Sequence, residues 1–126
     1  MNKKLLIASA AVALFAAGSV QAATIQLTSV SGIWTATNPV SPAVSGGGTN
    51  EIRWGNPANQ QNQQSGYRFD GYTPLPANIS ENTDFDLGTF THFNWPIYEP
   101  SLNTAQLTVE TNLTIDGRKT SETHCF

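Results

Sequence analysis

Cysteine is nearly absent from this chain of 126 residues, whose single cysteine is Cys125. A single cysteine cannot form a disulfide within the chain, so the fold must be held together by packing. Charged residues are also scarce, at 12% of the sequence, about half of the share in an average soluble domain. Acidic residues outnumber basic ones by 9 to 6, for a net charge of −3. This balance disfavours nucleic-acid binding, which needs a basic surface to follow the phosphate backbone.

Long apolar runs are missing after residue 22, so we expect no membrane span in that part of the chain. Residues 1–22 have the pattern of a signal peptide: Lys3 and Lys4, a mainly apolar run over residues 5–17, and a cleavage site with Val20 at −3 and Ala22 at −1. The apolar run spans roughly 20 Å as a helix, which is short of a hydrocarbon core of roughly 30 Å. Cleavage would leave residues 23–126 as one exported domain, with a net charge of −5 after loss of the two lysines.

Helical periodicity is also missing after residue 22, whereas alternation of apolar and polar residues recurs. It is clearest in residues 105–115, where one face has Leu107, Val109, Thr111, Leu113 and Ile115. Shorter strands are predicted at residues 25–28 and 33–34, as a pair broken at Ser31-Gly32, and at 49–54, 67–69 and 85–90. Residues 38–48, 55–66 and 73–84 are predicted loops. Residues 23–126 are therefore predicted to form one all-β domain, an antiparallel β-sandwich or a jelly-roll-like fold.

Three stretches carry a resemblance to a known family. They are residues 51–58, residues 64–71 and residues 87–97, and the last contains Thr91-His92-Phe93-Asn94. Together they resemble the THxN family of PEP-CTERM proteins and the related choice-of-anchor K domain, over about residues 32–115. The resemblance implies an exported bacterial surface domain that is attached to different anchors in different proteins and has no established biochemical activity.

The last eleven residues depart from that pattern. Family members continue with further strands after the position of Ile115, and PEP-CTERM proteins end in an anchor, whereas residues 116–126 have neither an apolar helix nor a Pro-Glu-Pro motif. We therefore expect a sandwich that lacks its C-terminal strands and anchor. Residues 105–115 would then be an exposed sheet edge that recruits other chains, so the protein should self-associate.

The Thr91-His92-Phe93-Asn94 segment is the first candidate site. His92 and Asn94 are two residues apart, so on a strand they would point to one side and could hold a ligand together. In the alternative reading, Thr91, His92 and Asn94 satisfy loop backbone groups where the strand ends before Pro96. A lone imidazole seldom makes a transition-metal site, so no metal is expected here.

Acidic side chains at residues 81–86 give a weak calcium candidate. Asp84 and Asp86, with Glu81 and Asn82 nearby, supply oxygen ligands of the kind that Ca²⁺ prefers, but the EF-hand pattern is missing. The same carboxylates could instead keep an edge strand soluble. We therefore expect no cofactor, with calcium at Asp84 and Asp86 as the alternative.

Aromatic residues are well represented, and their role depends on burial. Six of them are candidates either for the core or for a stacking surface for sugar rings: Trp34, Trp54, Tyr67, Tyr72, Trp95 and Tyr98. Trp54 shares its predicted face with Ile52, which favours the core. Trp95 and Tyr98 remain as candidate ligand-binding residues at the surface.

No residue pattern indicates catalysis. Ser65 is not in a Gly-x-Ser-x-Gly elbow, and the carboxylates Asp70 and Asp84 have no defined separation. His124 beside Cys125 lies at a chain end, where fraying is common. The expected function is therefore a non-enzymatic, structural or adhesive domain, secreted, periplasmic or at the cell surface, with envelope components or extracellular polysaccharide as partners. The alternative is a carbohydrate-binding module.

Overall fold

A computed structural model describes residues 3–4 and 21–126. The predicted signal peptide, residues 1–22, therefore falls largely outside the described residues. Every regular element in the described part of the chain is a strand, and none of its segments is a helix long and apolar enough to cross a membrane.

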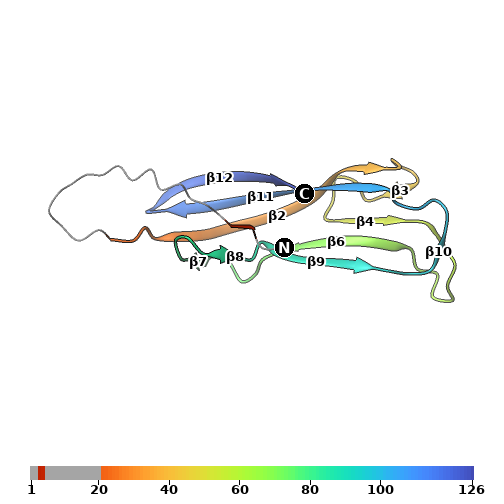
Figure 1. The fold of residues 1–126 in the computed structure, drawn as a ribbon, viewed down its shortest axis with the longest axis horizontal. Helices are drawn as coiled ribbons and strands as arrows, with labels where there is room; N and C mark the ends of the chain where they lie inside the picture. Colours follow the sequence, from red (N-terminus) through yellow and green to blue (C-terminus); the bar gives the residue numbers. More distant parts are fainter. Residues whose placement is uncertain (1–2, 5–20) are drawn as a thin grey trace.

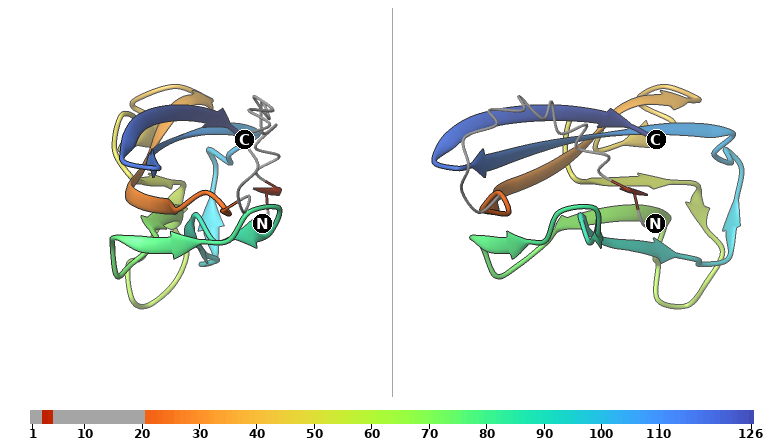
Figure 2. Two further views of the ribbon diagram at one scale, coloured as in Figure 1. Left: turned by 90° about the vertical axis from the view of Figure 1, so that its left-hand side faces the viewer. Right: turned by 60° about the vertical axis from the view of Figure 1, so that its left-hand side comes forward.

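The strands form two antiparallel four-stranded sheets that pack against each other (Figure 1; Figure 2). The order in sheet I is β12 (Arg118–Cys125), β11 (Thr104–Ile115), β2 (Ile25–Asn38) and β7 (Ala77–Ile79). The order in sheet II is β3 (Val44–Ser45), β4 (Glu51–Trp54), β6 (Ser65–Gly71) and β9 (Gly88–Phe93). Two short pairs complete the fold, β1 (Lys3–Lys4) with β8 (Asp84–Phe85) and β5 (Asn56–Pro57) with β10 (Ile97–Tyr98). The prediction of an all-β sandwich is confirmed.

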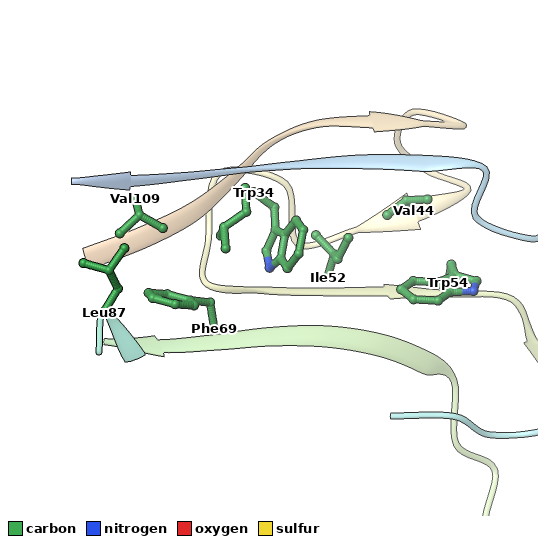
Figure 3. Close-up of a cluster of buried hydrophobic side chains, with 8 residues drawn as sticks. Trp34, Val44, Ile52, Trp54, Phe69, Leu87 and Val109 are labelled. Carbon is green, nitrogen blue, oxygen red and sulfur yellow. The ribbon is translucent and has the colours of Figure 1, made fainter. Parts of the chain in front are cut away.

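The main core lies between the sheets, and Figure 3 shows its side chains pointing toward one another. Ile52 and Trp54 of β4 are buried, whereas Glu51 and Arg53 lie on the outer face and form an ion pair at 2.7 Å. The predicted alternation in β4 is therefore confirmed. A second core cluster at the far end of the sheets contains Ile25, Leu27 and Leu113.

The alternation predicted in β11 is confirmed, because Leu107, Val109, Thr111 and Leu113 are all buried. The prediction that this strand is a sheet edge is wrong. β11 pairs with β2 on one side and with β12 on the other. The predicted self-association through β11 therefore loses its physical basis.

Residues 116–117 explain the error. Asp116 and Gly117 have φ values of 48° and 78°, as the two central residues of a type I′ hairpin turn require. An Asp-Gly pair after an alternating strand is a strong hairpin signal, and here it turns the chain into β12. Hence residues 116–126, which we expected to lack further strands, contain β12, the neighbour of β11.

We expect replacement of Gly117 by alanine to lower the free energy of unfolding by about 1 kcal/mol, because alanine is strained at positive φ. No atom would contact the added methyl group, so the effect would come from the backbone alone. Gly47→Ala is the matched control, since Gly47 also has open space but no positive φ. Urea denaturation of both variants measures the difference, and equal stability would contradict the turn assignment.

β2 is one continuous strand of 14 residues rather than the predicted pair. Gly32 does not form a turn; it is buried in mid-strand, where the ring of Phe69 lies against its backbone. The pairing register with β11 shifts twice, so that Thr28 and Thr35 are each an extra residue in β2. Each shift moves the inward-facing positions by one residue, and this interrupts the alternation on which the prediction relied.

The predicted loops also contain short strands. β3 lies in the first, β5 and the start of β6 in the second, and β7 in the third. Strands of two or three residues are too short to show an alternating pattern, so sequence periodicity does not detect them.

Thr111 on β11 offers a stabilising substitution. Its side chain is 1% exposed, and its hydroxyl has no hydrogen-bond partner among the described residues. Since valine has nearly the same shape without the unpaired hydroxyl, Thr111→Val should raise the unfolding free energy by about 1 kcal/mol. Thr123→Val, at an exposed position on β12, is the control. A loss of stability in Thr111→Val would show that the hydroxyl has a partner.

Candidate functional site

Tyr67 of β6 is the centre of an aromatic cluster. Its ring centroid lies 5.6 Å from that of Trp34 and 4.8 Å from that of Trp54. On its other side, the rings of Phe90 and His92 lie 5.0 Å and 4.9 Å away. The register explains this grouping: Tyr67 stands opposite Ile52 on β4 and opposite His92 on β9, so all three side chains share the inner face of sheet II.

The aromatic cluster runs from the core to the surface. Trp34 and Trp54 are buried and Tyr67 is half-buried, whereas Phe90 is 53% exposed and His92 is exposed. The exposed end lies on β9, the last strand of sheet II. An exposed phenylalanine supported from below by other rings is an apolar surface held in a fixed position.

An apolar groove adjoins this surface. It has a volume of about 80 Å³ and lies between β9 in sheet II and β11 in sheet I. Its lining side chains are almost entirely apolar: Phe69, Leu87, Phe90, Leu107, Val109 and Phe126, with Gly88. We call Phe90, His92 and this groove together the β9 rim.

On the outer face of sheet II, charged side chains of β4 and β6 lie beside β9. The guanidinium carbon of Arg53 lies 3.9 Å from the ring centroid of Phe93, and that of Arg68 lies 5.3 Å away. Arg68 is also ion-paired with Asp70 at 2.8 Å. Arg53 reaches Phe93 across Gly66, where any Cβ would lie 2.5 Å from the Cδ of Arg53. The stretch at residues 64–71 thus places Tyr67 on the inner face and Arg68 on the outer face.

The structure places His92 in β9 and Asn94 just after the strand. Phe93 between them points to the charged face, and His92 contacts the ring of Tyr67. Within residues 21–126, no side-chain hydrogen bond joins Thr91, His92 or Asn94 to a loop backbone group. The prediction that His92 and Asn94 hold a ligand together stays a prediction.

Ser65, rather than the Thr-His-x-Asn segment, bonds the backbone groups of the loop that follows β9. It is buried, and its Oγ donates to the carbonyl oxygen of Trp95 at 2.8 Å and accepts from the Trp95 backbone N–H at 3.1 Å. These two bonds fix the chain where it leaves β9. Trp95 is half-buried and Tyr98 is 70% exposed, so only Tyr98 is as exposed as we expected. In the described chain no ring contact joins either residue to the aromatic cluster.

The other candidate groups do not converge. Asp84 and Asp86 are exposed on either side of the half-buried Phe85, and the described residues contain no group of three or more His, Cys, Asp or Glu side chains that could hold a metal ion. Asp70 lies on the outer face of sheet II and His92 on the inner face. The structure therefore brings together aromatic rings rather than acids and bases.

Comparison of the chain with protein-family models, with curated proteins and with solved structures finds no match. The resemblance to the THxN and choice-of-anchor K families therefore stays a prediction.

Proposed function

We propose that this chain is an exported bacterial domain with a structural or adhesive role in the cell envelope or extracellular matrix, and that it acts by binding rather than by catalysis. The observation that carries the proposal is the β9 rim. Its surface gathers aromatic and apolar groups, which bind partners by stacking and by burial of area. The signal-peptide pattern supports export, and the family resemblance supports a place at the cell surface.

Retention of the purified protein on isolated cell envelopes and on extracellular polysaccharide tests the adhesive role. We expect Phe90→Ser to reduce the bound fraction about tenfold, because an aromatic hot-spot residue at the centre of a contact contributes more than about 1 kcal/mol, and 1.4 kcal/mol corresponds to about tenfold in affinity. Ile33→Ser is the matched control, since Ile33 is 42% exposed on the outer face of sheet I. Equal retention of the two variants, or no retention of the wild type, would contradict the proposal.

Export is tested separately by mass spectrometry of the protein in the exported fraction. Its first residue should be Ala23. An intact Met1 in that fraction would contradict cleavage after Ala22.

Carbohydrate binding is the second candidate, and the exposure of Tyr98 favours it. A glycan array with the purified protein tests it, with Trp95→Ala and Tyr98→Ala as variants. If sugars bind, Tyr98→Ala should weaken binding more than Trp95→Ala, because the ring of Tyr98 is the more exposed. Absence of binding at millimolar sugar would remove this candidate.

A further inference from the structure

β9 differs from the other edges of the two main sheets. In the described chain these sheets end in four strands, and natural edge strands are usually short or carry charge or proline. β12 contains Arg118, Lys119 and Glu122. β7 has three residues and follows Pro76, and β3 has two. β9 has six residues, Gly-Thr-Phe-Thr-His-Phe, without lysine, arginine, a carboxylate or proline.

The backbone of β9 offers hydrogen-bonding groups on its open side. Residues in an antiparallel pair alternate between those that bond the neighbouring strand and those that point away from it. The bond from the Tyr72 N–H to the Leu87 carbonyl oxygen, continued along the register, directs Thr89 and Thr91 toward β6. The N–H and C=O groups of Phe90 and His92 therefore point away from β6, along the free edge.

These two residues also lie on the inner face, where Phe90 lines the apolar groove. A strand added next to β9 would place every second side chain on this inner face, and one of them could reach the groove, because side chains alternate between faces. The groove's 80 Å³ suits one aliphatic side chain, since a cavity of about 150 Å³ holds benzene. The outer side chains of the added strand would lie beside Thr89 and Thr91, at the margin of the charged face.

We propose that β9 binds an extended segment of another polypeptide by antiparallel strand addition. The segment has valine or isoleucine at alternate positions and polar residues between them. Its backbone pairs with Phe90 and His92, and one of its apolar side chains enters the groove. This inference rests on the proposed adhesive role, to which it adds the class of partner.

A single strand fits this edge better than a second folded copy. β11 lies across the groove from β9, and β12 is the next strand of sheet I beyond β11. A strand added to β9 would lie opposite β12 and extend sheet II to match sheet I. A second copy paired β9 to β9 would bring its own β11 and β12 into the same space, so its sheet I would collide with that of the first copy.

Two N-methylated peptides test the proposal on the unchanged protein. The parent probe is a labelled eight-residue peptide in which valine alternates with threonine, and its binding is followed by fluorescence anisotropy. With the valine side chains inward, antiparallel pairing sets the valine N–H groups against Phe90 and His92. We expect saturable binding of the parent, a loss of about tenfold or more with N-methyl valines, and little change with N-methyl threonines.

The two methylated peptides have the same composition and number of methyl groups, so they control for each other. Similar affinity of both, loss of binding in both, a greater loss with N-methyl threonines, or no binding of the parent would overturn the proposal. His92→Pro is the supporting variant, because it removes an outward N–H without removing a bond to β6. It should lose peptide binding, whereas Ile33→Ser should keep it.

The outcome is distinguishable from failure of the adhesive role. If the peptide does not bind while the envelope still retains the protein through Phe90, strand addition is wrong and the adhesive proposal stands. If the protein binds the parent peptide as described and the envelope does not retain it, strand addition stands and the adhesive role is wrong.

Discussion

Replacing Trp34 by alanine is expected to lower the free energy of unfolding by about 3–5 kcal/mol, the range for loss of a large buried aromatic side chain. Trp34 is 4% exposed, and its indole Nε1 donates a hydrogen bond to the Asn50 carbonyl oxygen at 3.1 Å. Its ring stacks on Tyr67, so its removal also withdraws support from the exposed end of the cluster. For a small domain with about 5–15 kcal/mol of stability, this is a large fraction of the total.

Tyr98→Ala is the control for Trp34→Ala. Tyr98 is largely exposed, so its truncation should change the unfolding free energy by about 0.5 kcal/mol or less. Urea denaturation measures the unfolding free energy of both variants, and equal slopes against urea concentration allow the two values to be compared. A change below about 1 kcal/mol for Trp34→Ala would show that the ring is not part of a packed core.

Gly32→Val is expected to destabilise the domain by about 3 kcal/mol, at the upper end of the range for overpacked cores. A Cβ at Gly32 would lie 2.4 Å from Cδ1 of Phe69 and 2.8 Å from Cε1, and the Phe69 ring is itself buried. The Phe69 ring packs with Leu87 and Val109 in the same core cluster, and the three side chains also line the apolar groove, so a displacement of the ring disturbs both the core and the groove. Relief of the clash therefore requires the Phe69 ring to shift or the two sheets to separate locally.

A double-mutant cycle tests whether contact with the Phe69 ring causes the destabilisation by Gly32→Val. Phe69→Leu in the Gly32→Val background should recover part of the lost stability, although Phe69→Leu alone is destabilising. Gly47→Val is the control for the glycine itself, because a Cβ there meets no atom within 4 Å. Additive effects of the two substitutions, or a Gly32→Val variant of normal stability, would contradict the close approach of β2 to Phe69.

The sequence predicts strands well where alternation is regular. β4 and β11 keep a period of two along their length, and their inward and outward faces were predicted correctly. The same periodicity does not predict β2 as one strand, because the extra residues Thr28 and Thr35 shift its inward-facing positions. Gly32 was interpreted as a break because the sequence does not show that a ring from the other sheet lies against it. The Asp116-Gly117 pair predicts a hairpin turn from the sequence alone, but the expectation that the family domain ends early led to another interpretation of these residues.

The candidate site was likewise predicted only in part. In the sequence, Tyr67 is one of several aromatic residues and His92 is part of the Thr-His-x-Asn segment, and nothing there connects the two. Their contact depends on the register between β6 and β9, which no short-range pattern reveals. Phe90 was predicted only as a strand residue, although its two-residue spacing from His92 places both on one face. That spacing was the one available signal for the β9 rim.

The central claim is that, within residues 21–126, β9 is a sheet edge with one unpaired side whereas β11 is paired on both sides, and site-resolved amide hydrogen exchange tests it most directly. The amides of Phe90 and His92 should exchange fast and those of Thr89 and Thr91 slowly, because only the latter pair with β6. In β11, the amides from Thr108 to Leu113 should all be protected, because this strand has a partner on each side. Fast exchange at every second residue of β11, or uniform protection along β9, would contradict the account.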